Sequence, residues 1–355
     1  MPVLMRDVAR KAGVSITTVS HVLNETRPVA EDTRQRVLKA IQDLGYYANT
    51  SARLLVRGQS DLFGLIISDI ENPFFPELVK SFERACAEQR LEVLLSATNY
   101  DRSQAQNAVR RMLQNQVRAV AVMTSQFDAD LQAQLTGRKV PLVVLGAGAP
   151  GRNHSTIQID WLSGIAEAIR HLHRLGHRRF ALATGPQDQV SAVAHRDAVI
   201  KALAKLGQRP MRVLEGDHGP ESGADIAKVL LTARERPTVI FCGNDRMGIG
   251  AIGMARNLGL RVPEDVSVVG SDDVWIARYS SPPLTTVRIP RDTLGQLAFE
   301  VLMKMLHSKR RVGQRQVLKT ALVARGSTAQ AASGQESSGR DIRSFSAEPE
   351  SGFAD

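Results

Sequence analysis

Residues 5–24 read MRDVARKAGVSITTVSHVLN, and this stretch decides how the first part of the chain is built. Its apolar residues recur at helical spacing in two groups: Val8, Ala9 and Ala12, then Val19, Val22 and Leu23. Gly13 stands at the bend between the groups. The Ser15 hydroxyl can accept a hydrogen bond from an amide in the first turn of the second helix, which marks where that helix begins. The stretch therefore predicts two short helices joined by a tight turn.

The outward face of the second predicted helix carries short or hydrogen-bonding side chains: Ile16, Thr17, Thr18, Ser20 and His21. Hydroxyl and imidazole groups can contact base edges in the major groove of DNA, and an aliphatic group can contact a thymine methyl. These residues are compatible with DNA reading. On them alone, an ordinary helical hairpin remains the alternative.

Length and composition indicate a globular protein with two or three domains, because the chain has 355 residues, 43% hydrophobic and 23% charged. The sequence contains no run of eighteen apolar residues, and MPVLMRDVAR lacks the apolar region of a secretory signal. We expect Cys86 and Cys242 to be buried and reduced. These features predict a cytoplasmic location and no membrane partner. The net charge of +10 suits a polyanion but is spread along the chain.

From Leu62 onward, apolar runs of strand length alternate with amphipathic segments of helical period. The predicted strands include Leu62–Ser68, Leu91–Ala97, Arg118–Thr124, Leu142–Gly146, Arg179–Thr184, Thr238–Gly243 and Val266–Gly270. Uniformly apolar short strands between helices indicate parallel sheets covered on both faces. Two such sets predict a fold class of α/β type with two doubly wound lobes. On such folds ligands bind at the carboxyl ends of the strands, and between the lobes where there are two.

The expected domains follow from these changes in pattern. Residues 1–46 form a helical head, residues 47–60 a linker, and residues 61–328 the two-lobe body. The N-terminal lobe takes about 61–160 and 291–318, and the C-terminal lobe about 161–290 and 319–328. A single strand at Val317–Leu322 is expected near the crossing between the lobes. Residues 329–355 are rich in Ser, Gly and acidic residues, which predicts a disordered tail.

Several long, ordered motifs resemble the lac repressor family. They are the opening stretch, TRQRVLKAIQDLGYYAN, SARLL, ENPFF, GNDRMGIGA, VPEDVSVVGSDD and SPPLTTV, spread over residues 4–327. The resemblance implies an all-α helix-turn-helix head with a hinge helix, followed by two lobes of the periplasmic-binding-protein type. It also implies a DNA-binding transcriptional regulator that acts as a homodimer.

The resemblance further implies which residues contact DNA. Thr17 and His21 match positions of the recognition helix that meet base edges, within the set Ser15, Ile16, Thr17, Thr18, His21 and Asn24. In the linker, Leu55 matches the position of a leucine that enters the minor groove. Ala52 matches a position that packs against its symmetry mate, and Arg53 matches a position near the DNA backbone. The basic residues Arg10, Lys11 and Arg34 are expected to contact phosphates.

For the cleft, the resemblance implies that Phe74 and Phe75 stack on an effector from the first lobe. Arg196 and Asp245 match a pair that holds ligand hydroxyls from the second lobe, and Asp160 and Asp272 are further candidates. A guanidinium and a carboxylate together suit vicinal hydroxyls, so a sugar or sugar derivative is expected. Gly146 and Ala147 stand where the purine-repressor branch has an acid and a tryptophan, which argues against a purine effector.

Other motifs do not support an enzyme. Gly248–Gly253 fits G-x-G-x-x-G, but the intervening Asn244–Met247 prevents the first glycine from closing a turn directly after the strand. His171 and His173 point about 200° apart on a helix and cannot share a metal ion. No cofactor, metal site or catalytic residue is therefore expected.

The sequence predicts a sequence-specific DNA-binding transcriptional regulator, a repressor of a metabolic operon. It is expected to bind double-stranded DNA at a pseudo-palindromic operator and to respond to a small carbohydrate-like effector between its lobes. The alternative is a periplasmic-type sugar-binding protein, which the body alone would fit. An enzyme built on the same body is the third possibility.

Overall fold

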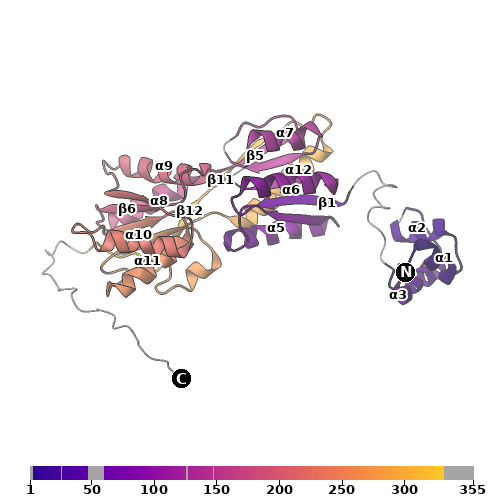
Figure 1. Ribbon diagram of the computed structural model, residues 1–355, viewed down its shortest axis with the longest axis horizontal. Coiled ribbons are helices and arrows are strands. Elements are labelled where there is room, and N and C mark those ends of the chain that lie inside the picture. Colours follow the sequence, from indigo (N-terminus) through magenta and orange to yellow (C-terminus); the bar gives the residue numbers. More distant parts are fainter. Residues whose placement is uncertain (1–2, 25, 47–59, 125–126, 147, 332–355) are drawn as a thin grey trace, which may run out of the picture.

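The computed structural model describes residues 3–24, 26–46, 60–124, 127–146 and 148–331. The predicted hinge residues Ala52, Arg53 and Leu55 lie outside the described residues, as do Ala147 and residues 332–355. Figure 1 shows the head, the two lobes of the body and the order of the elements along the chain.

The head is built from three helices, α1 (Met5–Ala12), α2 (Ile16–Asn24) and α3 (Glu31–Leu44). Gly13 ends α1 with φ of +66°, a left-handed conformation that favours glycine. The Ser15 hydroxyl accepts a hydrogen bond from the Thr18 amide at 3.0 Å, so the predicted cap at the start of α2 is confirmed. The core of the head is formed by one fully buried valine from each helix, namely Val8, Val19 and Val37.

The N-terminal lobe contains a six-stranded parallel sheet in the order β11-β5-β4-β3-β1-β2. Its strands are β1 (Leu62–Ile67), β2 (Glu92–Ala97), β3 (Ala119–Met123), β4 (Leu142–Leu145), β5 (His154–Asp160) and β11 (Arg315–Lys319). One face is covered by α5 (Phe74–Glu88) and α12 (Arg291–His307), the other by α6 (Arg102–Gln114) and α7 (Ala129–Gly137). The central strands β1, β3 and β4 are buried on both sides, as their uniformly apolar sequences predicted.

The C-terminal lobe repeats this plan in the order β12-β10-β9-β8-β6-β7, with only β12 antiparallel among its described strands. Its strands are β6 (Phe180–Thr184), β7 (Arg212–Glu215), β8 (Val239–Cys242), β9 (Ser267–Asp272), β10 (Thr285–Arg288) and β12 (Ala321–Val323). The helices α8 (Trp161–Arg174) and α9 (Val190–Ala204) cover one face, and α10 (Pro220–Leu231) and α11 (Asp245–Asn257) the other. A 3-10 turn, η1 (Trp275–Arg278), follows β9. The predicted α/β fold class is confirmed.

The structure differs from the expectations at four places. Strand β5 and helix α7 were not predicted from the sequence. The single strand expected at Val317–Leu322 is broken at Thr320, because β11 joins the sheet of one lobe and β12 the sheet of the other. The predicted tail begins too early, since Ala329 and Ala331 are hydrogen-bonded to the C-terminal lobe.

The chain crosses between the lobes at three places, after β5, after β10 and between β11 and β12. The Thr320 hydroxyl ties the first crossing to the third, because it donates to the Asp160 carbonyl (2.7 Å) and accepts from the Gly164 amide (2.9 Å). A Cβ at Gly164 would lie only 2.7 Å from the Ala321 nitrogen, so this close contact requires glycine. The two crossings therefore form one compact joint.

Candidate functional site

Among the predicted DNA-reading residues, Ile16, Thr17, Thr18 and His21 lie on α2 and, unlike Val19 and Val22, are not buried. Ile16 is 52% exposed and Thr17 is also exposed at the start of the helix. The Thr18 hydroxyl lies 2.9 Å from the Ser15 hydroxyl, and the His21 Nδ1 lies 2.7 Å from the Thr26 hydroxyl. These bonds orient Thr18 and His21 while the buried valines hold the helix from behind. The arrangement offers one row of hydrogen-bonding and aliphatic groups to a partner.

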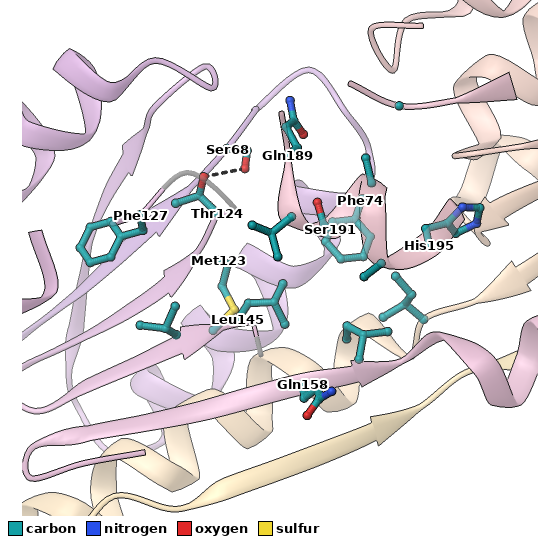
Figure 2. A pocket seen from close by; sticks show the side chains of 18 of the residues that line it. Ser68, Phe74, Met123, Thr124, Phe127, Leu145, Gln158, Gln189, Ser191 and His195 are labelled. Atoms are coloured by element: carbon teal, nitrogen blue, oxygen red, sulfur yellow. Dashed lines mark hydrogen bonds between the residues drawn. The ribbon is translucent and has the colours of Figure 1, made fainter. Parts of the chain in front are cut away.

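The body contains a cavity of about 330 Å³ between the two lobes, at the carboxyl ends of strands from both sheets. From the N-terminal lobe its wall includes Phe74 and Phe75 of α5, which were predicted from the sequence, together with Met123. The start of α9 contributes Ser191 and His195 from the other lobe. Figure 2 shows Phe74, Met123, Ser191 and His195 around the cavity, together with the hydrogen bond that the Ser68 hydroxyl donates to the Thr124 hydroxyl, which measures 2.9 Å. The volume is in the range of small-molecule sites.

Asp272, which was a candidate from the sequence, supplies a carboxyl group to the cavity wall. It is only 9% exposed, and within the described residues its carboxylate has no hydrogen-bond partner. Burial, with the Asp245 charge nearby, raises the pKa of this carboxyl well above its ordinary value. Its backbone has φ of +105°, a costly conformation for a residue with a side chain. The Arg291 guanidinium donates to the Asp272 carbonyl and holds the segment in this conformation.

Three more lining residues present buried polar atoms without a partner in the described part of the chain. They are the His154 Nε2, the Thr156 hydroxyl and the His218 Nδ1. Buried polar groups are almost always hydrogen-bonded, so such atoms at a cavity wall are what a ligand or water would satisfy. They face the cavity from both lobes, because His154 and Thr156 belong to β5 and His218 precedes α10. A ligand here would join the two lobes.

Aromatic rings form much of the remaining wall. Trp161 packs edge-on against His195 with ring centres 5.1 Å apart, and Tyr100 stacks across the cleft on His218 with ring centres 6.2 Å apart. Burial lowers the pKa of His195 to about 3 and that of His218 to about 4, so both imidazoles are neutral near pH 7. Neither histidine nor Trp161 nor Tyr100 was recognised from the sequence as a site residue.

The prediction that Asp245 contacts the effector is corrected by the structure. Asp245 is 1% exposed and does not line the cavity, and its carboxylate accepts hydrogen bonds from the Val274 amide and the Thr286 hydroxyl. The neighbouring Asn244 takes the position in the wall. Its side chain caps α11 by accepting from the Met247 amide and donates to the His218 carbonyl. The cap geometry turns Asn244 toward the cavity and Asp245 into the lobe.

Arg196 and Asp160 also lie outside the cavity wall. The Arg196 guanidinium donates to the Asp197 carboxylate and to the Gln187 side chain, which satisfies it away from the cavity. Asp160 caps α8 by accepting from the Ser163 amide at 3.3 Å. Of the six sequence candidates, the structure therefore brings together Phe74, Phe75 and Asp272.

One ion pair and a set of hydrogen bonds around Arg291 connect the lobes beside the cavity. Arg246 of α11 lies 3.4 Å from Asp69, which follows β1. The Arg291 guanidinium contacts Glu77 of α5 at 2.8 Å, and the Trp275 amide donates to the same carboxylate at 3.2 Å. Arg291 thereby links α5, which carries two aromatic residues of the cavity, to the backbone of Asp272. A change in the relative position of the lobes must alter these contacts.

We expect Asp245→Asn to change how stability depends on pH. Burial raises the pKa of Asp245 to about 7 in the folded state, against an ordinary value of 3.8. The folded state thus retains a proton that the unfolded state loses between about pH 4 and pH 7, and stability falls as pH rises through this window. Because asparagine does not titrate, the Asp245→Asn protein should lack this decrease in the free energy of unfolding, which is on the order of 3 kcal/mol. Denaturant unfolding at pH 5 and pH 8 measures the difference in unfolding free energy between the two pH values. An equal difference in the unsubstituted protein and in Asp245→Asn would contradict the prediction.

Within the described residues, no group of three His, Cys, Asp or Glu side chains could hold a metal ion. The same residues include no helix with the length and apolar character that a membrane span requires.

Comparison with known proteins matches two family models. Residues 4–49 match bacterial regulatory proteins of the lacI family, and residues 169–328 match a periplasmic binding protein-like domain. The HTH-type transcriptional repressor PurR of Proteus mirabilis (strain HI4320) is 38% identical over 331 residues, which cover 92% of this chain and 96% of that protein. PurR of Yersinia enterocolitica is also 38% identical over 331 residues, with the same coverage.

Solved structures are similar over the same extent. A lac repressor dimer bound to operator and the anti-inducer ONPF superposes with a TM-score of 0.82 at 30% identity, covering 93% of this chain and all of that one. A complex of the transcriptional regulator CelR with cellobiose gives a TM-score of 0.69 at 30% identity, covering 92% of this chain and 99% of that one. The likeness thus extends over both the head and the body.

Proposed function

Because the chain belongs to the lacI family of bacterial regulatory proteins, and is a DNA-binding transcriptional regulator, we propose that it represses a metabolic operon. A homodimer would place two heads on the half-sites of a pseudo-palindromic operator, since the two-fold axis of the protein must coincide with that of the site. The similar lac repressor structure is a dimer on its operator, which supports this assembly. The function is one of binding rather than catalysis, and we place it in the cytoplasm, with the DNA.

We propose that α2 reads the operator in the major groove. Thr17 and His21 are proposed as the main readers of base edges, within a set that comprises Ser15, Ile16, Thr17, Thr18, His21 and Asn24. The proposal extends to Ala52, Arg53 and Leu55 in the hinge, which lie outside the described residues. An inserted aliphatic side chain costs a few kcal/mol of unstacking, which the contacts of a bent duplex offset.

The effector proposed for the cleft is a small neutral carbohydrate-like molecule. The observation that carries this is Asp272, a buried carboxylate without a partner among the described residues, in a wall of aromatic rings. Its oxygens can accept hydroxyl protons from a ligand. In the described part of the chain, no lysine or arginine lines the cavity, and burial keeps His195 and His218 neutral. Phosphorylated ligands are therefore disfavoured.

We propose that Phe74, Phe75, Asn244 and Asp272 contact the effector in this conformation. A ligand that contacts both walls changes the angle between the lobes, and with it the Arg246–Asp69 pair and the hydrogen bonds from Arg291 to the Asp272 and Asp273 carbonyls. An effector shifts operator affinity only by the difference in its own affinity for the two arrangements of the lobes. This couples the cleft to the DNA-reading heads.

The test combines selection of DNA with a ligand screen. Binding to randomised duplexes, followed by gel shift, is expected to enrich a palindromic site. A thermal-shift screen of sugars and nucleosides, each beside its phosphorylated form, is expected to show stabilisation by a neutral compound. Failure to retard any DNA would exclude the regulator, and the periplasmic-type binding protein would then stand. Preferred binding of phosphorylated compounds would exclude the neutral effector alone.

A further inference from the structure

One end of the C-terminal lobe carries a cluster of exposed arginines, which we call the arginine face. It lies where the strands begin, opposite the cavity, and consists of Arg178, Arg179, Arg209, Arg212, Arg234 and Arg236. Within the described part of the chain, none of these side chains forms an ion pair with a carboxylate. Glu235 lies among them, and Asp265, whose ion pair is with Arg261, is close enough to Arg236 to interact with its charge. The face therefore presents a concentration of positive charge with little internal compensation.

The topology explains why arginines distant in sequence meet there. Strand β6 lies between β7 and β8, with Arg212 in register with Ala181 and Val239 with Phe180. The Arg179 guanidinium donates to the Arg236 carbonyl at 2.9 Å. Neighbouring strands are about 4.8 Å apart, so the loops that precede these three strands form one continuous edge. A groove of about 1,040 Å³ runs along it, lined by Arg209, Arg212 and Arg234.

The described part of the chain ends at this same edge. After β12 the backbone returns to the end of α8, where the Ala329 carbonyl lies 2.9 Å from His177 Nε2. The Ala331 amide then donates to the Leu175 carbonyl at 2.7 Å. Leu175 is only three residues before Arg178. The described part of the chain therefore ends close to Arg178 of the arginine face.

The sequence that follows is complementary to this surface. Residues 332–355 contain five carboxylates and two arginines, a net charge of −3. An extended chain spans at most about 3.5 Å per residue, so Glu336 lies within about 18 Å of Ala331. The same segment carries Phe345 and Phe353, and the arginine face is bordered by the exposed apolar residues Met211 and Val213. Both the charge and the apolar groups of the segment thus have counterparts on the lobe.

We propose that residues 332–355 dock on the arginine face of their own chain and shield it from nucleic acid. A cluster of arginines binds phosphates of any sequence, and such contacts retain a regulator on non-operator DNA. The carboxylates of the segment occupy the place of those phosphates. When the segment is docked, the arginine face is covered and DNA contacts the protein through the head.

The first test follows the segment in the full chain. A nitroxide spin label at Ser351→Cys reports on it specifically, since Cys86 and Cys242 are fully buried. At 50 mM salt the label is expected to show restricted motion, and at 500 mM salt the motion is released, because screening shortens the range of charge attraction. The substitutions Arg209→Gln, Arg212→Gln and Arg234→Gln together should release the label already at 50 mM salt.

A matched variant controls for total charge. Arg110→Gln, Arg111→Gln and Arg138→Gln remove the same charge from an exposed part of the N-terminal lobe and should leave the label restricted. Equal mobility of the label in the unsubstituted chain and in both variants would overturn the proposal. So would equal release by the two variants.

The second test measures shielding with a 24-base-pair duplex that lacks an operator. A chain that ends at Ala331 is expected to bind it about fivefold more tightly than the full chain at 50 mM salt, as removal of a competing polyanion predicts. The Arg209, Arg212 and Arg234 substitutions should remove this gain. Unchanged affinity after truncation would contradict the shielding, as would a gain that persists in the substituted chain. Failure of either test leaves the regulator function intact, because operator binding through the head is measured separately.

Discussion

Asp272→Asn is expected to weaken effector binding by roughly 10- to 100-fold and to remove the effect of the effector on operator binding. The carboxylate is 9% exposed in the cavity wall, and its backbone is held by Arg291. A buried polar group left without its hydrogen-bond partner costs about 1–3 kcal/mol, and asparagine replaces one of the two carboxyl oxygens by an amide that donates at that position. Operator affinity without effector should be unchanged, because the head is not altered.

The measurement uses the compound that stabilises the unsubstituted protein most in the thermal-shift screen. Its affinity can be followed by the fluorescence of Trp161 in a Trp275→Phe background, since the chain has two tryptophans and Trp161 lines the cavity. Asp245→Asn is the matched control, because this neighbouring acid lies outside the wall and should keep the response. An Asp272→Asn protein with an unchanged effector response would refute the assignment.

Val19→Asp is expected to abolish operator binding, with a loss of at least about 1,000-fold, equivalent to about 4 kcal/mol. Val19 is fully buried in the small core of the head, beside Val8 and Val37. An isolated carboxylate there costs several kcal/mol, and a domain of this size has little stability in reserve. The two-lobe body has its own cores and should keep its thermal transition and its effector binding.

Gel shift on the selected operator and calorimetry of the same preparation measure the two effects together. Ile16→Ser provides the comparison on the same helix, because Ile16 is 52% exposed and its substitution leaves the core of the head intact. This variant should bind with altered base preference and a loss of about tenfold or less. Retention of operator affinity in Val19→Asp would show that α2 does not depend on this core.

Most of the fold could be predicted because its strands are short, apolar and separated by amphipathic helices. Strand β5 escaped prediction for a physical reason. Its sequence, HSTIQID, contains polar residues at positions that the structure places in the cavity wall, among them His154, Thr156 and Gln158. Such residues replace the apolar pattern that identifies a buried strand. Departures of this kind are expected where a protein binds a ligand.

The candidate site could be predicted in part. ENPFF placed Phe74 and Phe75 correctly in the wall, because they begin the helix that follows β1. Between Asn244 and Asp245, however, the sequence could not decide which side chain faces the cavity. One residue along a helix start changes the direction of a side chain by about 100°, and the cap bond to Met247 sets that direction. Residues such as Trp161 and His218 enter the site through tertiary packing, which leaves no local pattern.

The joint at Thr320 limits how the two lobes can move when a ligand binds in the cleft. Because it unites two of the crossings, the lobes are attached at two separate positions, the joint itself and the crossing after β10. Two points of attachment define a line, and rotation about that line is the one rigid movement that leaves both intact. Sliding or twisting of the lobes would instead strain the hydrogen bonds of Thr320. Effectors of different shapes then act on the DNA-reading heads only through the value of this one angle between the lobes.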